Sequence, residues 1–293
     1  MTFQNNSKGY ELLDSGYGRK LERFGDVVLE RPCSQAIWVP SLERRIWDSA
    51  DATFDREDGN RWDGLQRLPR HWVIEECGIK FNLSVTDFGH LGLFPEQRAQ
   101  WRWIGEQVKT ERARSGKAPS VLNLFAYSGG SSMAAALAGG AVCHLDASRG
   151  MVQWASENAA LNDVDSVRWI VDDAHKFMAR EIKRGKVYDA IILDPPTFGR
   201  GEGGEMYKIE RDLPETLQMC RRLLSENPLF MLMSAHTPGL SPQVGGNLVL
   251  QAMDGLGGSI ETGEMLLTGS EDVLPLPSGT FARWQSGTAQ NRG

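Results

Sequence analysis

Short apolar runs alternate with amphipathic segments along the second half of the chain. Four segments with helical spacing of apolar residues predict helices, at 132–138, 151–161, 175–183 and 213–224. Five runs rich in Val, Ile, Leu and Met predict buried strands, at 121–125, 142–145, 167–171, 190–193 and 229–233. This alternation indicates a mostly parallel sheet covered by helices on both faces, as in α/β proteins.

The two ends of the chain have different patterns. Residues 259–267 and 280–284 predict two strands with no helix between them, so we expect an antiparallel C-terminal pair to close the sheet. Near the other end, residues 10–13 and 27–29 predict strands, and Ser41 is a suitable N-cap for a helix through Trp47. The polar stretch 48–70 predicts a loop, and 71–75 with 79–85 a hairpin.

These patterns predict two domains. We expect a small N-terminal α+β domain over residues 1–88 and a Rossmann-like α/β domain over 89–293. A helix opening at Pro95, with Trp101, Ile104 and Val108 at helical spacing, would lead into the second. The length of 293 residues agrees, because a single core seldom grows beyond about 250–300 residues.

Charge and cysteine content narrow the function classes. The net charge of −6 argues against a globally basic nucleic-acid binder but leaves room for a local basic patch. The four cysteines form no CxxC pair, which favours free buried thiols in a reducing cytoplasm and no metal site. The uncharged run 118–145 is broken by Ser and Gly, and the N-terminus lacks an apolar core, so we expect neither a membrane span nor a signal peptide.

Polar residues and glycines follow the predicted strands in order. Ala126 to Gly130 follows the first strand, Asp146 the second, and Asp172 with Asp173 the third. Ligands bind at the carboxyl ends of strands in such sheets, where glycines admit a ligand to the backbone and an acid can bind two ribose hydroxyls. The GxGxxG fingerprint is absent, which disfavours NAD and leaves S-adenosylmethionine, a cofactor without phosphate.

The sequence DPPTF, at 194–198, follows the fourth strand. Two prolines fix the backbone and remove two N–H donors, so Asp194 and neighbouring carbonyls would form a rigid set of acceptors for an amino group. Phe198 could stack on a planar base. The alternative is an ordinary turn at a strand end. Because the glycine loop, Asp146 and Asp173 occur in the expected order, we favour the functional interpretation.

Together these segments resemble a known family. VLNLFAYSGG, the Asp146 segment, VDDA and DPPTF resemble class I S-adenosylmethionine-dependent methyltransferases, and more narrowly the large-subunit ribosomal RNA methyltransferases that modify cytosine carbon 5 or guanine. GHLGLFPEQR, at 89–98, resembles the segment before the catalytic domain of that branch. YELLDSGYGRKLERFG resembles its small substrate-facing domain.

The resemblance implies roles for matching residues. Asp146 would bind the ribose, Asp173 the adenine amino group, and Gln97 and Arg98 would lie near the carboxylate of the cofactor. Asp194, Pro195, Pro196 and Phe198 would form the catalytic loop. The complete set expected at S-adenosylmethionine is Gln97, Arg98, Phe125, Ala126, Tyr127, Ser128, Gly129, Asp146, Ala147, Asp173, Ala174 and Asp194.

One departure from the family concerns the nucleophile. Cytosine carbon-5 enzymes of this branch use a cysteine after the fifth strand, where this chain has MSAHTP at 233–238. Cys220 lies on the preceding predicted helix and is expected in the core. Covalent chemistry needs a thiolate, so we expect non-covalent transfer to a base nitrogen, with guanine favoured. His236 fits a proton acceptor or an ordinary loop histidine.

Structured RNA, ribosomal above all, is the expected substrate. Cations that could form a local patch are Arg98, Arg102, Arg200, Lys208 and Arg211, with Arg19, Lys20 and Arg23 on the small domain. The alternatives are a methyltransferase of a protein side chain or small metabolite, which would suit the acidic balance, and a non-catalytic RNA-binding scaffold. The nine tryptophans fit a core, a base-stacking surface or a homodimer contact alike.

Overall fold

The computed structural model describes residues 8–56, 59–200, 204 and 206–287, and the chain forms two compact units. The first unit comprises Met1–Arg98 and Leu266–Ser278, and the second comprises Ala99–Met265 and Gly279–Gly293. The first unit is therefore discontinuous in sequence: residues 266–278 belong to it, although they follow most of the second unit along the chain.

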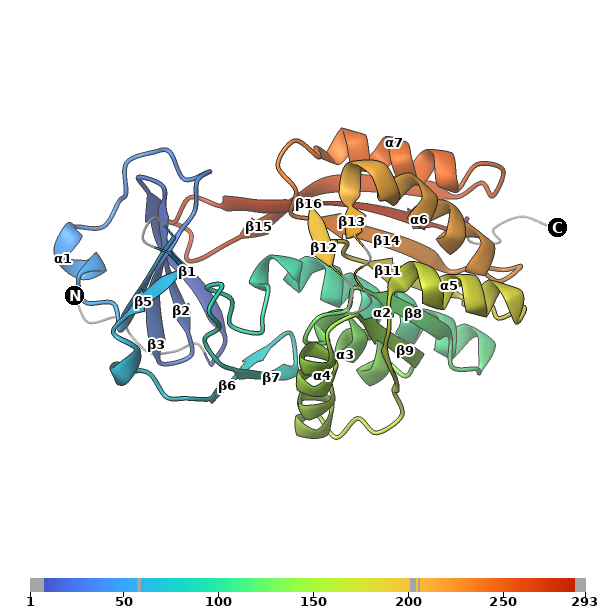
Figure 1. The fold of residues 1–293 in the computed structure, drawn as a ribbon, viewed down its shortest axis with the longest axis horizontal. Coiled ribbons are helices and arrows are strands. Elements are labelled where there is room, and N and C mark those ends of the chain that lie inside the picture. Colours follow the sequence, from blue (N-terminus) through green and yellow to red (C-terminus); the bar gives the residue numbers. More distant parts are fainter. Residues whose placement is uncertain (1–7, 57–58, 201–203, 205, 288–293) are drawn as a thin grey trace. The chain divides into compact units, whose positions relative to one another are not determined.

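The first unit contains a five-stranded sheet in the order β1-β2-β3-β4-β5 and a separate hairpin, β6-β7 (Figure 1). A four-residue helix, α1 (Arg44–Trp47), and the 3-10 turns Leu65–Arg67 and Pro95–Gln97 complete the unit. The strands are β1 (Tyr10–Gly16), β2 (Arg19–Phe24), β3 (Val27–Pro32), β4 (Ala52–Asp55), β5 (Arg61–Asp63), β6 (Trp72–Glu76) and β7 (Ile79–Leu83).

Ion pairs allow a charged segment to form β2, between β1 and β3 of this sheet. Glu22 is fully buried, and its carboxylate lies 2.7 Å from Arg31 Nη2 and 3.1 Å from Lys20 Nζ. Burying a carboxylate is tolerated when a cation compensates it. The sequence pattern missed β2 for this reason. The loop predicted over 48–70 was also wrong in part, because Thr53 and Phe54 of β4 pair with Asp63 and Trp62 of β5.

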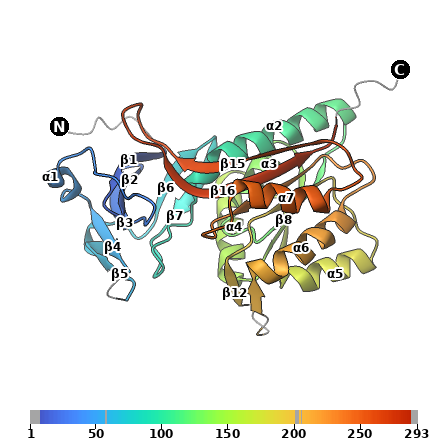
Figure 2. The ribbon, with the colours of Figure 1, turned by 90° about the horizontal axis from the view of Figure 1, so that it is seen from above.

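A seven-stranded sheet forms the centre of the second unit, in the order β10-β9-β8-β11-β14-β16-β15. The first five strands are parallel and β16 is antiparallel to β14, which confirms the predicted fold class and its C-terminal strand pair. β15 and β16 run side by side (Figure 2). The bounds are β8 (Ser120–Leu124), β9 (Ala141–Asp146), β10 (Arg168–Val171), β11 (Ala190–Leu193), β14 (Phe230–Ala235), β15 (Ser259–Leu267) and β16 (Leu276–Gln285).

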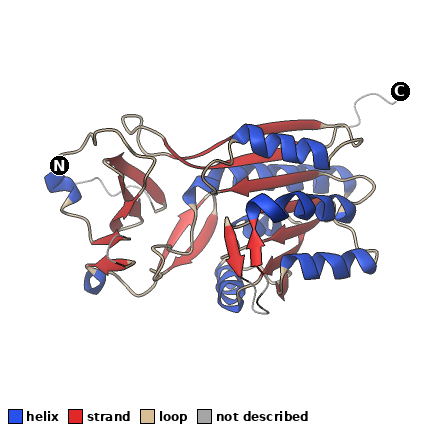
Figure 3. Cartoon of the chain, turned by 45° about the horizontal axis from the view of Figure 1, so that its top comes forward, coloured by secondary structure: helices blue, strands red, loops and turns tan. Residues whose placement is uncertain are grey.

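Helices cover both faces of this sheet (Figure 3). A continuous apolar core joins α5, α6 and α7 to one face, and α3 and α4 pack against β9 on the other. α7 was not predicted. The helices are α2 (Arg98–Ser115), α3 (Gly130–Leu137), α4 (Arg149–Leu161), α5 (Ala174–Lys183), α6 (Ile209–Leu223) and α7 (Pro242–Ala252).

The segment after β11, the tryptophans and the helices each bear on an expectation from the sequence. A small hairpin, β12 (Phe198–Arg200) with β13 (Met206–Lys208), follows DPPTF, and the glycine-rich run 199–204 falls partly on residues 201–203, which lie outside the described ones. All nine tryptophans are buried or half-buried, which favours packing over an exposed stacking surface. Within the described residues, no helix has the length and apolar character needed to cross a membrane.

Candidate functional site

The parallel strands of the second unit end at one edge of the sheet. Leu124 of β8 is paired with Leu145 of β9 and with Leu193 of β11, and Leu193 is paired with Met233 of β14. The residues that follow these strands therefore lie along the same edge of the sheet. This register brings together the loop after β8, Asp146 and Asp194, as expected from the sequence.

The loop from Phe125 to Gly129 has an uncommon backbone conformation. Phe125, Tyr127 and Gly129 have positive φ angles of 54°, 50° and 93°. This conformation costs a residue with a side chain about 1–3 kcal/mol, and such strained residues cluster at functional sites. A Cβ atom at Gly129 would lie 3.1 Å from Ala155 Cβ, so the glycine allows α4 to pack closely against the loop.

Two main-chain N–H groups fix the carboxylate of Asp146 at the end of β9. Tyr127 N–H donates to Oδ2 and Ser148 N–H donates to Oδ1, each at 2.9 Å. Burial raises the pKa of Asp146, and the two hydrogen bonds oppose that rise. Because a carboxylate has about four acceptor positions, both oxygens can accept a further hydrogen bond. The group suits a ligand with two adjacent hydroxyls.

A buried polar network supports this loop from within the sheet. Asn123 Nδ2 donates to Ser132 Oγ at 2.9 Å, and Ser132 Oγ lies 2.9 Å from His144 Nδ1. Burial lowers the pKa of His144 to about 3, so its imidazole is neutral at physiological pH. Sequence reasoning missed this network, because each residue lies inside an otherwise apolar element.

The acids that follow β10 have structural roles. Asp173 is the N-cap of α5, and its Oδ1 accepts a hydrogen bond from Lys176 N–H at 2.9 Å. Asp172 forms an ion pair with Arg180 and accepts a hydrogen bond from Asp173 N–H. Ala174, which follows Asp173, is buried in the first turn of the helix. An N-cap side chain is held rigidly, which would also suit a ligand contact.

Asp194 lies beside His236, from the loop that follows β14. Its Oδ2 is 3.5 Å from His236 Nε2, and both side chains are partly exposed. Thr197 Oγ1 and Thr237 Oγ1 form a second contact between the same two loops, at 2.8 Å. A Cβ atom at Gly279 would come within 3.0 Å of His236 Nδ1, so the glycine makes room for the imidazole. The two loops thus form one acid–imidazole group.

The rest of DPPTF leads into the β12–β13 hairpin. Phe198 is 57% exposed, as a residue that stacks on a ligand would be. Tyr207 on β13 packs against Phe125, with ring centroids 5.3 Å apart, and burial raises the pKa of its hydroxyl. We did not identify Tyr207 from the sequence, because strands of three residues give no periodic pattern.

Gln97 and Arg98 belong to the first unit. Gln97 is buried, and the Arg98 guanidinium donates to Thr268 Oγ1 at 2.7 Å and lies 5.2 Å from the centre of the Tyr10 ring. The described contacts of Arg98 are therefore structural contacts within that unit. The role of Gln97 and Arg98 near the carboxylate of the cofactor stays a prediction.

The cysteines are poorly placed for nucleophilic chemistry. Burial raises the pKa of Cys143 to about 11 and that of Cys220 to about 12, which keeps both thiols protonated. Cys220 lies in the core on α6, as expected. Cys33 and Cys77 are half-buried and belong to no disulfide. Among the described residues, no group of three or more His, Cys, Asp or Glu side chains could hold a metal ion.

Comparisons with known proteins agree with this geometry. A family model described as S-adenosylmethionine-dependent methyltransferase matches residues 20–230. Ribosomal RNA large subunit methyltransferase K/L from Shewanella sp. (strain ANA-3) is 33% identical over 218 residues, which cover 70% of this chain and 28% of that protein. The chain thus spans less than a third of the length of this curated relative.

Two solved structures resemble the whole fold. The S-adenosylmethionine-dependent methyltransferase from Agrobacterium tumefaciens is 38% identical with a TM-score of 0.89, over 96% of this chain and 92% of that one. A proposed methyltransferase from Streptococcus mutans is 18% identical with a TM-score of 0.74, over 97% of this chain and 76% of that one, and shares the fold.

Proposed function

Because the chain belongs to the S-adenosylmethionine-dependent methyltransferase family, we propose that it transfers the methyl group of that cofactor to a base of structured RNA. A ribosomal RNA is the favoured substrate, since the curated relatives are named as large-subunit ribosomal RNA methyltransferases. Guanine is the favoured base and a nitrogen the favoured acceptor atom. Such an enzyme would work in the cytoplasm.

The chemistry of the donor set fits the cofactor. Asp146, with one acceptor position left on each oxygen, would bind the ribose hydroxyls, and Ala147 follows it on the same loop. Phe125, Ala126, Tyr127, Ser128 and Gly129 would line the methionine part, where α4 approaches the backbone closely. Asp173, fixed as an N-cap, would meet the adenine amino group, with Ala174 beside it.

The pair formed by Asp194 and His236 carries the proposal of a nitrogen acceptor. When bound, the cofactor supplies an electrophilic methyl group. The methyl group would pass to the lone pair of the base nitrogen, and the sulfur would keep the electron pair of the S–C bond. An amino or ring N–H group must then lose a proton, which Asp194 or His236 would accept. Pro195 and Pro196 would hold the carbonyls of the catalytic loop, and Phe198 would stack on the base.

A covalent mechanism has no support from the cysteines. The segment after β14 has His236 and no cysteine, and the buried thiols of Cys143 and Cys220 have raised pKa values. A thiolate is needed for attack on a pyrimidine ring. We therefore propose non-covalent transfer.

RNA would meet a local basic patch on an otherwise acidic protein. In the second unit, Arg102, Lys208 and Arg211 are exposed. We propose that residues 1–88 form the part that faces the substrate, although Arg23 is buried and Arg19 and Lys20 already form ion pairs with Glu30 and Glu22. A homodimer is a further proposal and would enlarge the positive surface.

The test is methyl transfer from tritiated S-adenosylmethionine to ribosomal RNA, to intact ribosomal subunits and to total protein, all from a strain that lacks the gene. We expect label in RNA and, after digestion to nucleosides, in a methylated guanosine. Label in protein or in small metabolites alone would overturn the RNA substrate. A chain that fails to bind S-adenosylmethionine in calorimetry would instead be a non-catalytic scaffold.

A further inference from the structure

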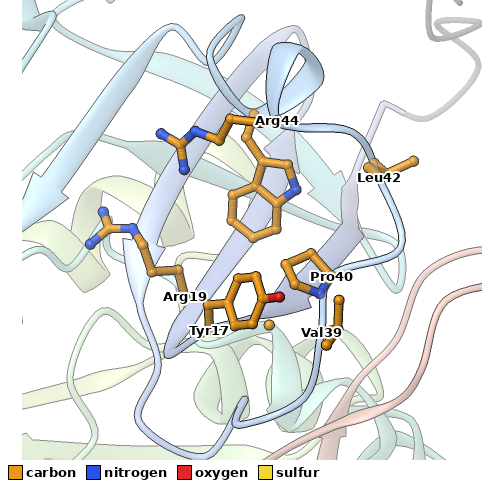
Figure 4. A pocket seen from close by; sticks show the side chains of 8 residues that line it. Tyr17, Arg19, Val39, Pro40, Leu42 and Arg44 are labelled. Carbon is orange, nitrogen blue, oxygen red and sulfur yellow. The ribbon is translucent and has the colours of Figure 1, made fainter.

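The first unit carries a small recess that the site above does not use. Its volume is about 150 Å³. The lining comes from the β1–β2 turn, the start of β2, the segment after β3, and α1 (Figure 4). It consists of Gly16, Tyr17, Arg19, Val39, Pro40, Leu42, Arg44 and Trp47.

Tyr17 presents an exposed aromatic ring on a turn whose main chain is hydrogen-bonded. The residue is 70% exposed, yet it has a positive φ of 49°, which is costly for a tyrosine. Its N–H donates to Trp38 O at 2.9 Å, and the N–H of Gly18 donates to Ala36 O at 2.7 Å. The turn is thus held at the recess by main-chain hydrogen bonds. An exposed aromatic ring carried on such a turn is suited to stacking on a nucleobase.

Trp47 of α1 contributes a second aromatic side chain to the lining. Trp47 is buried, and its Nε1–H donates to Asp14 Oδ2 at 3.1 Å. The same carboxylate accepts hydrogen bonds from the N–H groups of Ser41 and Leu42. The recess therefore exists before a ligand arrives. A cavity of about 150 Å³ has room for one benzene-sized ring, which matches a single base.

The charged residues in the lining are both arginines. Figure 4 shows the guanidinium groups of Arg19 and Arg44 on the same side of the recess. Glu30, whose side chain is only 4% exposed, forms ion pairs with both. Arg44 also pairs with the exposed Asp48 at 2.8 Å, and Arg19 with Asp55 at 3.7 Å. Because a guanidinium has five N–H donors, Arg44 keeps donors for a further anion. The side chain of Arg44 is 68% exposed. Guanidinium groups beside an aromatic slot match a phosphate joined to a base.

We propose that this recess binds one unpaired base of the RNA, with Tyr17 stacked on the base and Arg44 in contact with a neighbouring phosphate. The proposal rests on RNA being the substrate. An aromatic side chain of a protein partner would fill the same volume, but it would not use the N–H donors that the Arg44 guanidinium keeps beside its ion pairs with Asp48 and Glu30.

Binding of a fluorescein-labelled single-stranded oligouridylate, followed by fluorescence anisotropy, tests the stacking. Tyr17→Ala should weaken binding by about tenfold, the loss typical of one stacked base. Phe88→Ala is the matched control, because Phe88 is a 67% exposed aromatic residue of the first unit outside the recess. An abasic oligomer of the same length should bind the wild type and Tyr17→Ala equally.

The phosphate contact has a separate readout. Arg44→Ala should weaken binding and lower the slope of log affinity against log salt by about 0.7, as expected for one contact to a single strand. Arg45→Ala, at the next residue and outside the recess, should leave the slope unchanged.

Three results would overturn the proposal. In the first, Tyr17→Ala and Phe88→Ala bind the oligomer with equal affinity. In the second, the wild type binds the abasic and the normal oligomer with equal affinity. In the third, Tyr17→Ala binds RNA as the wild type does but loses a co-purifying ribosomal protein. Methyl transfer to RNA by the wild-type chain is measured in parallel. If the wild type transfers methyl groups to RNA, any of these three results refutes only the proposal that the recess binds a base. If the wild type transfers none, the proposed function itself is refuted.

Discussion

At the scale of single residues, the two acids of the site differ in what holds them. Asp146 is fixed by two main-chain N–H groups, whereas Asp194 lies beside an imidazole. Main-chain donors fix a position, and an imidazole can exchange a proton near neutral pH. We therefore expect Asp146 to act in cofactor binding and Asp194 in turnover, and each acid can be tested separately.

Asp146→Ala should weaken the binding of S-adenosylmethionine by tenfold or more. The substitution removes the acceptor for the ribose, and it also removes the acceptor of the Tyr127 and Ser148 N–H groups. Isothermal titration calorimetry measures the affinity. Asp165→Ala, in the exposed loop before β10, should bind as the wild type does.

Asp194→Ala should mainly remove turnover, by about 10²–10⁴-fold, the range of general acid–base catalysis. Single-turnover methylation gives the rate, and calorimetry should show cofactor affinity within a few-fold of wild type. His236→Gln should lower kcat less than Asp194→Ala does, because the carboxylate beside it remains to accept the proton. Full methyl transfer by Asp194→Ala would refute the catalytic assignment.

His144 should make stability dependent on pH. Its folded-state pKa is lowered to about 3 by burial, whereas the unfolded chain titrates near 6.5. Protonation therefore favours the unfolded chain, so the stabilisation is complete above about pH 6.5 and is lost as the pH falls toward 3. Within that window it falls by about 1.4 kcal/mol per pH unit.

Urea unfolding at several pH values checks this effect. His144→Gln should show a shallower fall of the unfolding free energy between pH 6.5 and pH 4.5 than the wild type. His71→Gln alters an exposed histidine and should leave the wild-type slope unchanged. Identical slopes in all three proteins would mean that His144 does not titrate as described.

At the scale of secondary structure elements, the sequence predicted the strands that lie inside the parallel sheet. β8, β11 and β14 are buried along almost their whole length and therefore appear as unbroken apolar runs. β2 was missed because its charged residues Glu22 and Arg19 pair with Arg31 and Glu30 on β3, which a single sequence does not reveal. α7 was missed although Ser241 and Pro242 form a recognisable N-cap and N1 pair.

The candidate site was predictable to the same extent. Acids directly after strands reach the common edge because parallel register places them there. Tyr207 reaches Phe125 only through the fold of the β12–β13 hairpin, and Asn123, Ser132 and His144 meet only when α3 packs on the sheet. Contacts made by tertiary packing leave no periodic pattern in one sequence.

Asp173 at the start of α5 offers a test that separates capping from ligand binding. Asp173→Asn retains an N-cap of similar quality, whereas Asp173→Ala should cost about 1 kcal/mol of stability. If the carboxylate also meets the adenine amino group, both variants should bind S-adenosylmethionine more weakly. Chemical unfolding and calorimetry on the two proteins measure the two effects, and unchanged affinity in both would limit Asp173 to capping.

At the scale of the whole molecule, each unit has its own buried interior. The second has the apolar core of the seven-stranded sheet, and the first includes a buried ionic cluster in which Glu22 accepts hydrogen bonds from Arg31 and from Tyr10 Oη. Burial opposes ionisation of Glu22, but Arg31 and Lys20 outweigh it and lower its pKa. The units can therefore be perturbed separately.

Glu22→Gln should destabilise the first unit by about 3–5 kcal/mol, because Arg31 would be left buried without its charged partner. Differential scanning calorimetry should show one lowered transition, while the transition that S-adenosylmethionine raises stays in place. Glu43→Gln breaks an exposed ion pair with Arg45 and is the control. A single transition that shifts as a whole would mean that the units unfold together.

The discontinuous path of the first unit has a consequence for biosynthesis. β1 is an edge strand, and its Leu12 N–H donates to the carbonyl of Thr268 at 3.2 Å. Because a nascent chain emerges from its N-terminus, the outer edge of β1 stays open until Thr268 has been translated. In the interval its open edge can pair with other chains. A polypeptide released before residue 268 would keep that edge unpaired, and we expect such fragments to aggregate or require a chaperone.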